Sequence, residues 1–111
     1  MKFAFPDAQD QAAKQDRGKV RWSLLLAHMP RALESVIAVR AYGESKYGTS
    51  ESWKTVEPER YLEAAQRHLV AAFKGERMNA EDGGVNHIAQ AVVDLLFALE
   101  IEERRLAHGD E

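Results

Sequence analysis

The sequence predicts an all-α protein, a small helical bundle with three main helices and an irregular N-terminal arm. Two observations support this prediction: apolar residues recur at helical spacing in three separate segments, and no segment alternates apolar and polar residues convincingly as a half-buried strand would. The helices are expected near residues 30–47, 58–74 and 85–105. The 111 residues suit one domain, which we place at 18–107, after a flexible N-terminal segment over 1–17.

The first helix is expected to begin at Pro30, because proline fits the first helical turn, where its missing N–H is not needed. It should end near Gly43 or continue to Gly48. Its apolar residues recur at helical spacing: Leu33, Val36, Ile37 and Ala41. The preceding residues 18–26 form either a short helical turn or an extended arm docked on the core.

The second helix has clearer ends. Pro58 suits the first turn, the flanking Glu57 and Glu59 favour the positive end of the helix dipole, and Gly75 stops the helix. A loop rich in Asn, Asp and Gly follows over 76–84. The third helix then carries one apolar stripe: Ile88, Val92, Leu95 and Leu99.

Composition excludes several classes of protein. With 45% hydrophobic and 30% charged residues, the chain is neither a disordered tail nor a membrane protein. The absence of cysteine excludes disulfides and thiolate zinc sites, and no signal peptide is recognisable, so we expect a cytoplasmic protein. The net charge of −3 argues against nucleic acid as a partner, whereas a few well-placed Lys or Arg residues suffice to bind a phosphate-bearing small molecule.

Asp94 is the most informative residue of the chain. It lies where the predicted third helix is apolar nearly all round, and a buried carboxylate must be paired, metal-bound or protonated because its desolvation is costly. Gln90 and His87 lie four and seven residues earlier on the same helix face. These three residues are expected to form a polar stripe along a hydrophobic helix.

The second helix repeats this pattern with His68, which shares its face with alanines and so permits a neighbouring helix to approach closely. If the two helices pack antiparallel, His68 meets the stripe of His87 and Asp94. Carboxylates together with imidazole suit a divalent cation, and an oxygen-rich site favours magnesium or manganese. The linking loop adds three carboxylates: Glu76, Glu81 and Asp82.

Structural explanations for the same residues stay open from the sequence alone. A histidine on an apolar helix face is more often a hydrogen-bonded core residue than a ligand. Asp94 has two candidate partners for a structural ion pair, Arg67 and Arg40. In a purely structural interpretation, three side chains satisfy one another in a core network: His68, His87 and Asp94.

Several short motifs occur in an order that resembles a known family. They are Gly18-Lys19-x-Arg21, Tyr42-Gly43-x-x-Lys46-Tyr47-Gly48, Trp53, Arg67-His68-Leu69, Gly75-Glu76, His87-Ile88-Ala89, Asp94 and Leu96-Phe97. Over residues 18 to about 100, they resemble the phage and bacterial dATP/dGTP diphosphohydrolase N-terminal-type domain. That family is similar to the wider MazG-like all-α nucleotide pyrophosphohydrolases, which are helical and usually oligomeric.

The resemblance implies an enzyme of a bacterial host cell that converts a purine deoxynucleoside triphosphate to the monophosphate and pyrophosphate, with Mg²⁺ or Mn²⁺ as cofactor. It implies a homo-oligomer and assigns His87 and His68 to catalysis. The residues implied to bind the metal are Glu76, Glu81 and Asp94. Those implied to hold the substrate are Lys19, Lys46 and Arg67 at the phosphates and Trp53 on the base.

The sequence departs from the family pattern at three positions, where Ser52, Asn79 and Gln90 stand in place of residues that are commonly Asn, Asp and His. The alternative function is a non-catalytic helical module that binds a nucleotide or a protein partner. This alternative predicts binding or oligomerisation without hydrolysis.

Overall fold

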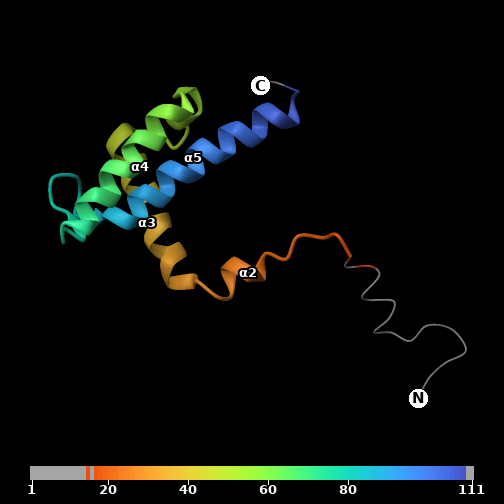
Figure 1. The fold of residues 1–111 in the computed structure, drawn as a ribbon, viewed down its shortest axis with the longest axis horizontal. Coiled ribbons are helices and arrows are strands. Elements are labelled where there is room, and N and C mark those ends of the chain that lie inside the picture. Colours follow the sequence, from red (N-terminus) through yellow and green to blue (C-terminus); the bar gives the residue numbers. More distant parts are fainter. Residues whose placement is uncertain (1–14, 16, 110–111) are drawn as a thin grey trace, which may run out of the picture.

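Three long helices dominate the computed structural model, which describes residue 15 and residues 17–109 (Figure 1). They are α3 (Pro30–Tyr47), α4 (Pro58–Phe73) and α5 (His87–Ala107). They confirm the all-α prediction, and each of their ends lies within two residues of the predicted position. The predicted flexible segment over 1–17 lies almost entirely outside the described residues. The short elements are α2 (Ser23–Leu26), the 3₁₀ helix η1 (Ser52–Thr55), β1 (Met78–Asn79) and β2 (Val85–Asn86).

Local signals explain where the long helices begin and end. Pro30 and Pro58 occupy the first turns of α3 and α4, as predicted. Gly48 ends α3 because its positive φ of 73° allows its N–H to bond back to the Glu44 carbonyl. Asn86 caps α5 by accepting a hydrogen bond from the Ala89 N–H.

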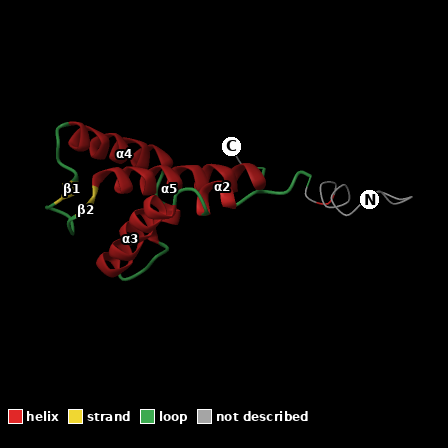
Figure 2. Ribbon diagram, turned by 90° about the horizontal axis from the view of Figure 1, so that it is seen from below, coloured by secondary structure: helices red, strands yellow, loops and turns green. Residues whose placement is uncertain are grey.

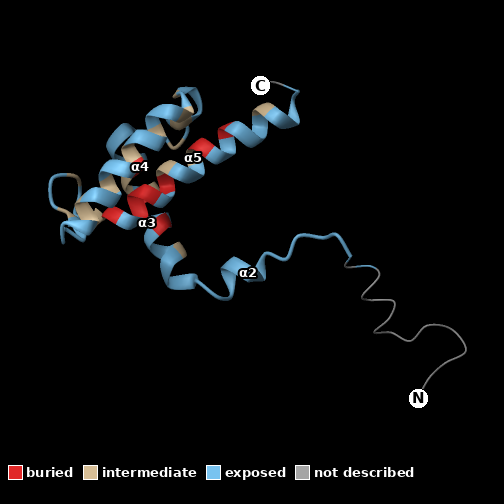
Figure 3. Ribbon diagram, in the orientation of Figure 1, coloured by how far each residue is buried: buried red, intermediate tan, exposed pale blue. Residues whose placement is uncertain are grey.

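Helices α4 and α5 run antiparallel and lie side by side, while α3 packs across α5 (Figures 1 and 2). Small residues permit the close approach, since Ala65 of α4 is only 2% exposed and Ala91 of α5 only 1%. The buried centre lies where the three helices meet (Figure 3). Its cluster joins α3 to α5 through four side chains: Val36, Val39, Ala89 and Val93.

A two-stranded hairpin joins α4 to α5, with Met78 paired to Asn86 and Asn79 to Val85. The sequence did not predict it, because strands of two residues are too short to show an alternating pattern. Its turn includes Gly83, which has a φ of 76° and lies so close to α3 that a Cβ atom there would overlap the ring of Tyr42. The turn is therefore packed directly against α3.

The segment before α3 forms the short helical turn that was one of two expectations for residues 18–26. No residue of α2 is buried, and its three leucines are each more than half exposed: Leu24, Leu25 and Leu26. Among the described helices, none combines the length and apolarity needed to cross a membrane.

Candidate functional site

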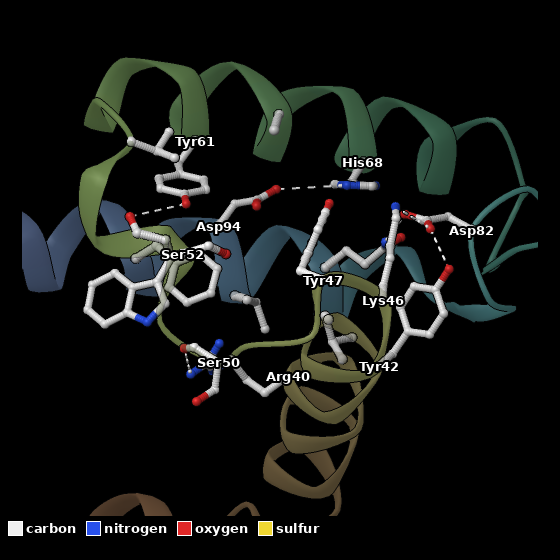
Figure 4. Close-up of a pocket in the computed structure, with 18 of the residues that line it drawn as sticks. Arg40, Tyr42, Lys46, Tyr47, Ser50, Ser52, Tyr61, His68, Asp82 and Asp94 are labelled. Atoms are coloured by element: carbon white, nitrogen blue, oxygen red, sulfur yellow. Dashed lines mark hydrogen bonds and ion pairs between the residues drawn. The ribbon is translucent and has the colours of Figure 1, made fainter.

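A cleft of about 600 Å³ lies between α3, α4, α5 and the loop that carries η1 (Figure 4). It is positively charged on several sides and contains two carboxylates. Its basic residues are Arg40, Lys46, Arg60 and Arg67. Its aromatic residues are Tyr42, Tyr47, Trp53, Tyr61 and Phe97, and its acids are Asp82 and Asp94.

The Asp94 side chain is half-buried in this cleft, with 15% of its surface exposed. Its Oδ2 atom has no hydrogen-bond partner among the described residues and lies 3.8 Å from Nε2 of His68. Burial raises the pKa of the Asp94 carboxyl from 3.8 to about 6, although the nearby charge of Arg67 opposes this shift. The prediction that the Asp94 carboxyl is largely removed from solvent is therefore confirmed.

Neither of the ion pairs considered for Asp94 forms within 4 Å among the described side chains. The guanidinium of Arg40 instead donates to the Ser50 carbonyl at 3.0 Å and lies 5.0 Å from the centre of the Phe97 ring. Asp94 is thus a desolvated carboxylate that faces the cleft without a counter-ion in contact.

The two predicted histidines meet between α4 and α5. Nδ1 of His68 lies 2.9 Å from Nδ1 of His87, and Nε2 of His87 lies 2.5 Å from Oε1 of Glu76. Burial, followed by the neighbouring His87 ring, lowers the pKa of His68. The expected core network exists, but Glu76 rather than Asp94 completes its hydrogen bonds.

One arrangement of protons satisfies both hydrogen bonds of His87 when Glu76 is a carboxylate. A neutral imidazole has one N–H, and the Glu76 carboxylate accepts the proton on Nε2 of His87. Nδ1 of His87 then accepts from the Nδ1–H of His68, which leaves Nε2 of His68 as an acceptor that faces Asp94. The 3.8 Å between this nitrogen and Oδ2 of Asp94 is longer than a hydrogen bond, so the bonded chain runs from His68 through His87 to Glu76, whose side chain is 52% exposed.

Asp82 organises a second polar cluster at the other end of the cleft. Its Oδ1 atom accepts hydrogen bonds from the Tyr42 hydroxyl at 2.6 Å and from Nζ of Lys46 at 2.9 Å. These bonds, that of Lys46 first, lower the pKa of the Asp82 carboxyl and keep it ionised. Gln90 donates to Asp82 at 3.5 Å and accepts from Asn79 at 3.0 Å, so two of the three residues that depart from the family pattern bond to each other.

The structure places some predicted site residues together and others apart. Glu81 is exposed in the turn and Lys19 in the segment before α2, and neither lines the cleft. Within residues 17–109, no group of three or more His, Asp or Glu side chains is arranged to hold a metal ion. Three residues were predicted to bind magnesium, and their carboxylates do not converge on one point in this structure: Glu76, Glu81 and Asp94. The predicted residues that do line the cleft are Lys46, Trp53, Arg67, His68 and Asp94.

Trp53 lines the cleft but its ring is already enclosed. It stacks on Phe97 with 5.1 Å between ring centres and an angle of 7°, and the guanidinium of Arg104 lies 5.3 Å over it. Phe97 and Arg104 are seven residues apart on α5, or roughly 10.5 Å along the helix axis. Two side chains of α5 thus already contact the indole ring.

Sequence reasoning assigned no role to Tyr42 or Tyr47, and it named Asp82 only as one of three loop carboxylates, although all three residues line the cleft. A signal for the first was available, because Tyr42 and Lys46 are four residues apart and therefore share one face of α3. Asp82 carried no such signal, since spacing within a turn does not tell which of two adjacent acids faces inward.

Comparison with known proteins identifies the family. The family description "dATP/dGTP diphosphohydrolase, N-terminal" matches residues 9–110. This chain belongs to that family. A protein named dATP/dGTP diphosphohydrolase, from Salmonella phage PMBT28, is 35% identical over 97 residues, which are 87% of this chain and 32% of the phage protein.

Membership in the dATP/dGTP diphosphohydrolase N-terminal family confirms the resemblance inferred from the sequence motifs. The chain spans about a third of the length of its curated phage relative. No solved structure matches this member of the family.

Proposed function

We propose that this domain binds a purine deoxynucleoside triphosphate of the dATP/dGTP type in the cleft and hydrolyses it to the monophosphate and pyrophosphate, in the cytoplasm of a bacterial host. The observation that carries the proposal is the presence of the half-buried Asp94 carboxylate in the same cleft as several basic side chains. A base and a set of phosphate ligands are the two elements that this hydrolysis requires. The family and the name of the phage relative support the choice of substrate.

The phosphates are proposed to bind along α4. Arg60 and Arg67 are seven residues apart, or two helical turns, and both line the cleft. Guanidinium groups bind phosphate oxygens through paired hydrogen bonds. Lys46 adds a third positive charge, part of which Asp82 already neutralises at 2.9 Å.

Asp94 is proposed to act as the general base. It takes a proton from water as the water oxygen bonds to the α-phosphorus and the bond to the bridging oxygen of the leaving pyrophosphate breaks. A rotation of the Asp94 side chain that shortens its 3.8 Å distance to Nε2 of His68 then lets the proton move to that nitrogen, while the Nδ1–H of His68 moves to Nδ1 of His87. The resulting His87 imidazolium is stabilised by the Glu76 carboxylate at 2.5 Å.

Magnesium is proposed to arrive with the nucleotide rather than to be held by the protein. The described carboxylates do not assemble a site with three ligands, whereas a triphosphate binds Mg²⁺ through its own oxygens. The substrate is then the magnesium complex, and Mn²⁺ should substitute for Mg²⁺. Nucleotide affinity measured with and without Mg²⁺ tests this proposal.

The proposed activity is tested by pyrophosphate release from each of the four deoxynucleoside triphosphates, with purified chain and MgCl₂. Turnover of dATP or dGTP well above that of the pyrimidine nucleotides is expected. A Glu34→Gln variant is the matched control, because this exposed acid of α3 lies outside the cleft and its loss should leave the rate unchanged. Binding without turnover would instead support the non-catalytic module, and neither binding nor turnover would refute both.

We also propose that two copies associate through the side of α4 and α5 that faces away from the cleft. Of the eight buried hydrophobic residues described, four are alanines, so one copy has a small core. Helical periodicity places one exposed apolar stripe on this side of each helix. The stripe of α5 is Ile88, Val92, Leu95 and Leu99, and that of α4 is Leu62, Leu69 and Phe73.

Light scattering on the purified chain should therefore give twice the 12.5 kDa of one copy. Leu95→Glu should shift the mass to that of a monomer, because it places a charge in the centre of the apolar stripe. Ile37→Glu is the control, since Ile37 is exposed on α3, outside the proposed interface, and the variant should stay dimeric. A monomeric wild type at micromolar concentration would contradict the proposed association.

A further inference from the structure

Recognition of a base by stacking requires an aromatic ring in the cleft with a free face. Five aromatic residues line the cleft, and four of them are committed to other contacts. Trp53 is enclosed by Phe97 and Arg104, and Phe97 also contacts the Tyr61 ring at 5.0 Å. The Tyr61 hydroxyl bonds to the Trp53 carbonyl at 3.3 Å. Tyr42 is held by Asp82 and by the turn at Gly83.

Tyr47 is the fifth, and it differs from the others in exposure. It is the last residue of α3 and is 64% exposed, although it lines the cleft. Figure 4 shows it reaching from the end of α3 toward His68, between Asp94 and Asp82. Its ring is thus accessible to a ligand that occupies the cleft.

The position of the Tyr47 ring is supported from one face. Nζ of Lys46 lies 5.3 Å from the ring centre, within cation–π range, and the same ammonium group is anchored to Asp82 at 2.9 Å. A cation on one face leaves the opposite face for a flat ligand. A ring that is already held in place also loses less conformational entropy when it binds.

We propose that Tyr47, and not Trp53, is the residue on which the nucleobase stacks. This inference rests on the proposed function and adds how the base is recognised. The base lies on the free face of Tyr47, with its phosphates directed toward Arg60 and Arg67 on α4. Stacking does not read hydrogen-bond donors and acceptors, so adenine and guanine are both accepted, and a purine presents more surface than a pyrimidine.

The test compares ligands with and without a base. Dissociation constants are measured for the non-hydrolysable α,β-methylene analogues of dATP and dGTP, and for inorganic tripolyphosphate, all with Mg²⁺. Tyr47→Ala should weaken both nucleotide analogues roughly 5- to 100-fold, the usual range for loss of one base–aromatic stack, and leave tripolyphosphate unchanged. Tyr47→Phe keeps the ring and should bind all three ligands within a few-fold of wild type.

Trp53→Leu is the contrasting variant, because it removes the other aromatic ring proposed for the base. The quantity compared is the ratio of nucleotide affinity to tripolyphosphate affinity. This ratio should stay at the wild-type value, and if the variant does not fold, the two Tyr47 variants decide alone. An unchanged ratio in Tyr47→Ala, or wild type that binds tripolyphosphate as tightly as the nucleotides, would overturn the inference but leave a phosphate-binding cleft. Failure of wild type to bind any of the three ligands would overturn the proposed function as well.

Discussion

Replacing Asp94 by asparagine is expected to lower kcat for nucleotide hydrolysis roughly 10²- to 10⁴-fold, the usual contribution of a general base. Asparagine has nearly the same size and keeps a polar group in the cleft, but it cannot accept a proton from water. The rate of pyrophosphate release measures the effect. The Asp94→Asn protein should retain helical circular dichroism and nucleotide affinity, so that the loss is assigned to chemistry.

The pH dependence of the wild-type rate provides an independent check on this role. Because burial raises the pKa of Asp94 to about 6, the basic form dominates only above that pH. The value of kcat/KM should fall about tenfold per pH unit below it, for this one ionisation. Residual activity in Asp94→Asn above about a third of wild type would contradict a role as base.

The same substitution is expected to stabilise the fold at high pH. The Asp94 carboxyl ionises near 3.8 in the unfolded chain and near 6 in the folded protein, so the folded state binds more protons between these values. Its contribution to the free energy of unfolding is therefore present below pH 3.8 and is lost as the pH rises to about 6. The loss amounts to about 3 kcal/mol, from about two pKa units.

Urea unfolding of both proteins at pH 4 and pH 8 measures this effect. The stability of Asp94→Asn relative to wild type should increase by about 2.4 kcal/mol between the two pH values, because part of the full effect is already lost at pH 4, just above the unfolded pKa. Asp82→Asn is the matched control and should show the opposite sign. The Asp82 pKa is lowered by Lys46 and Tyr42, so the native carboxylate stabilises the fold above its unfolded pKa and loses that effect in acid. An identical pH dependence for wild type and Asp94→Asn would show that Asp94 is not desolvated.

The two expected results together would describe a residue that costs stability for the sake of the proposed reactivity. A carboxylate in water has a pKa too low to make a good base, and burial moves that pKa toward neutrality. The cost is tolerated because Asp94 lies beside polar groups: a neutral His68 at 3.8 Å and the positive cleft wall that includes Arg67.

Most of the secondary structure was predictable because it depends on neighbours in the sequence. Pro30 and Pro58 mark helix starts through their fixed φ, and apolar spacing marks the helices themselves. It did not show which face turns inward, because the apolar stripes of α4 and α5 lie on the exposed side while small residues such as Ala65 and Ala91 are buried. Asp94 and His87 could be assigned to one polar stripe because helical periodicity places residues seven apart on one face. The packing of small residues on α4 against α5 then brought His68 to His87, as expected.

The site beyond these helices depended on contacts that no local pattern contains. The turn at residues 79–84 folds against α3, so that Asp82 bonds to Tyr42, forty positions earlier, while the adjacent Glu81 stays exposed. The same hairpin brings Glu76 to His87 and removes it from the predicted metal site.

By itself, the sequence determined the three helices, the family and the buried carboxyl at Asp94, because each follows from periodicity or from motifs along the chain. The tertiary structure alone decided that Asp82 and not Glu81 lines the cleft, and that Trp53 is enclosed while Tyr47 is exposed. The physical reason is that a side chain can bind a ligand only if residues distant in the sequence do not already contact it in the folded protein.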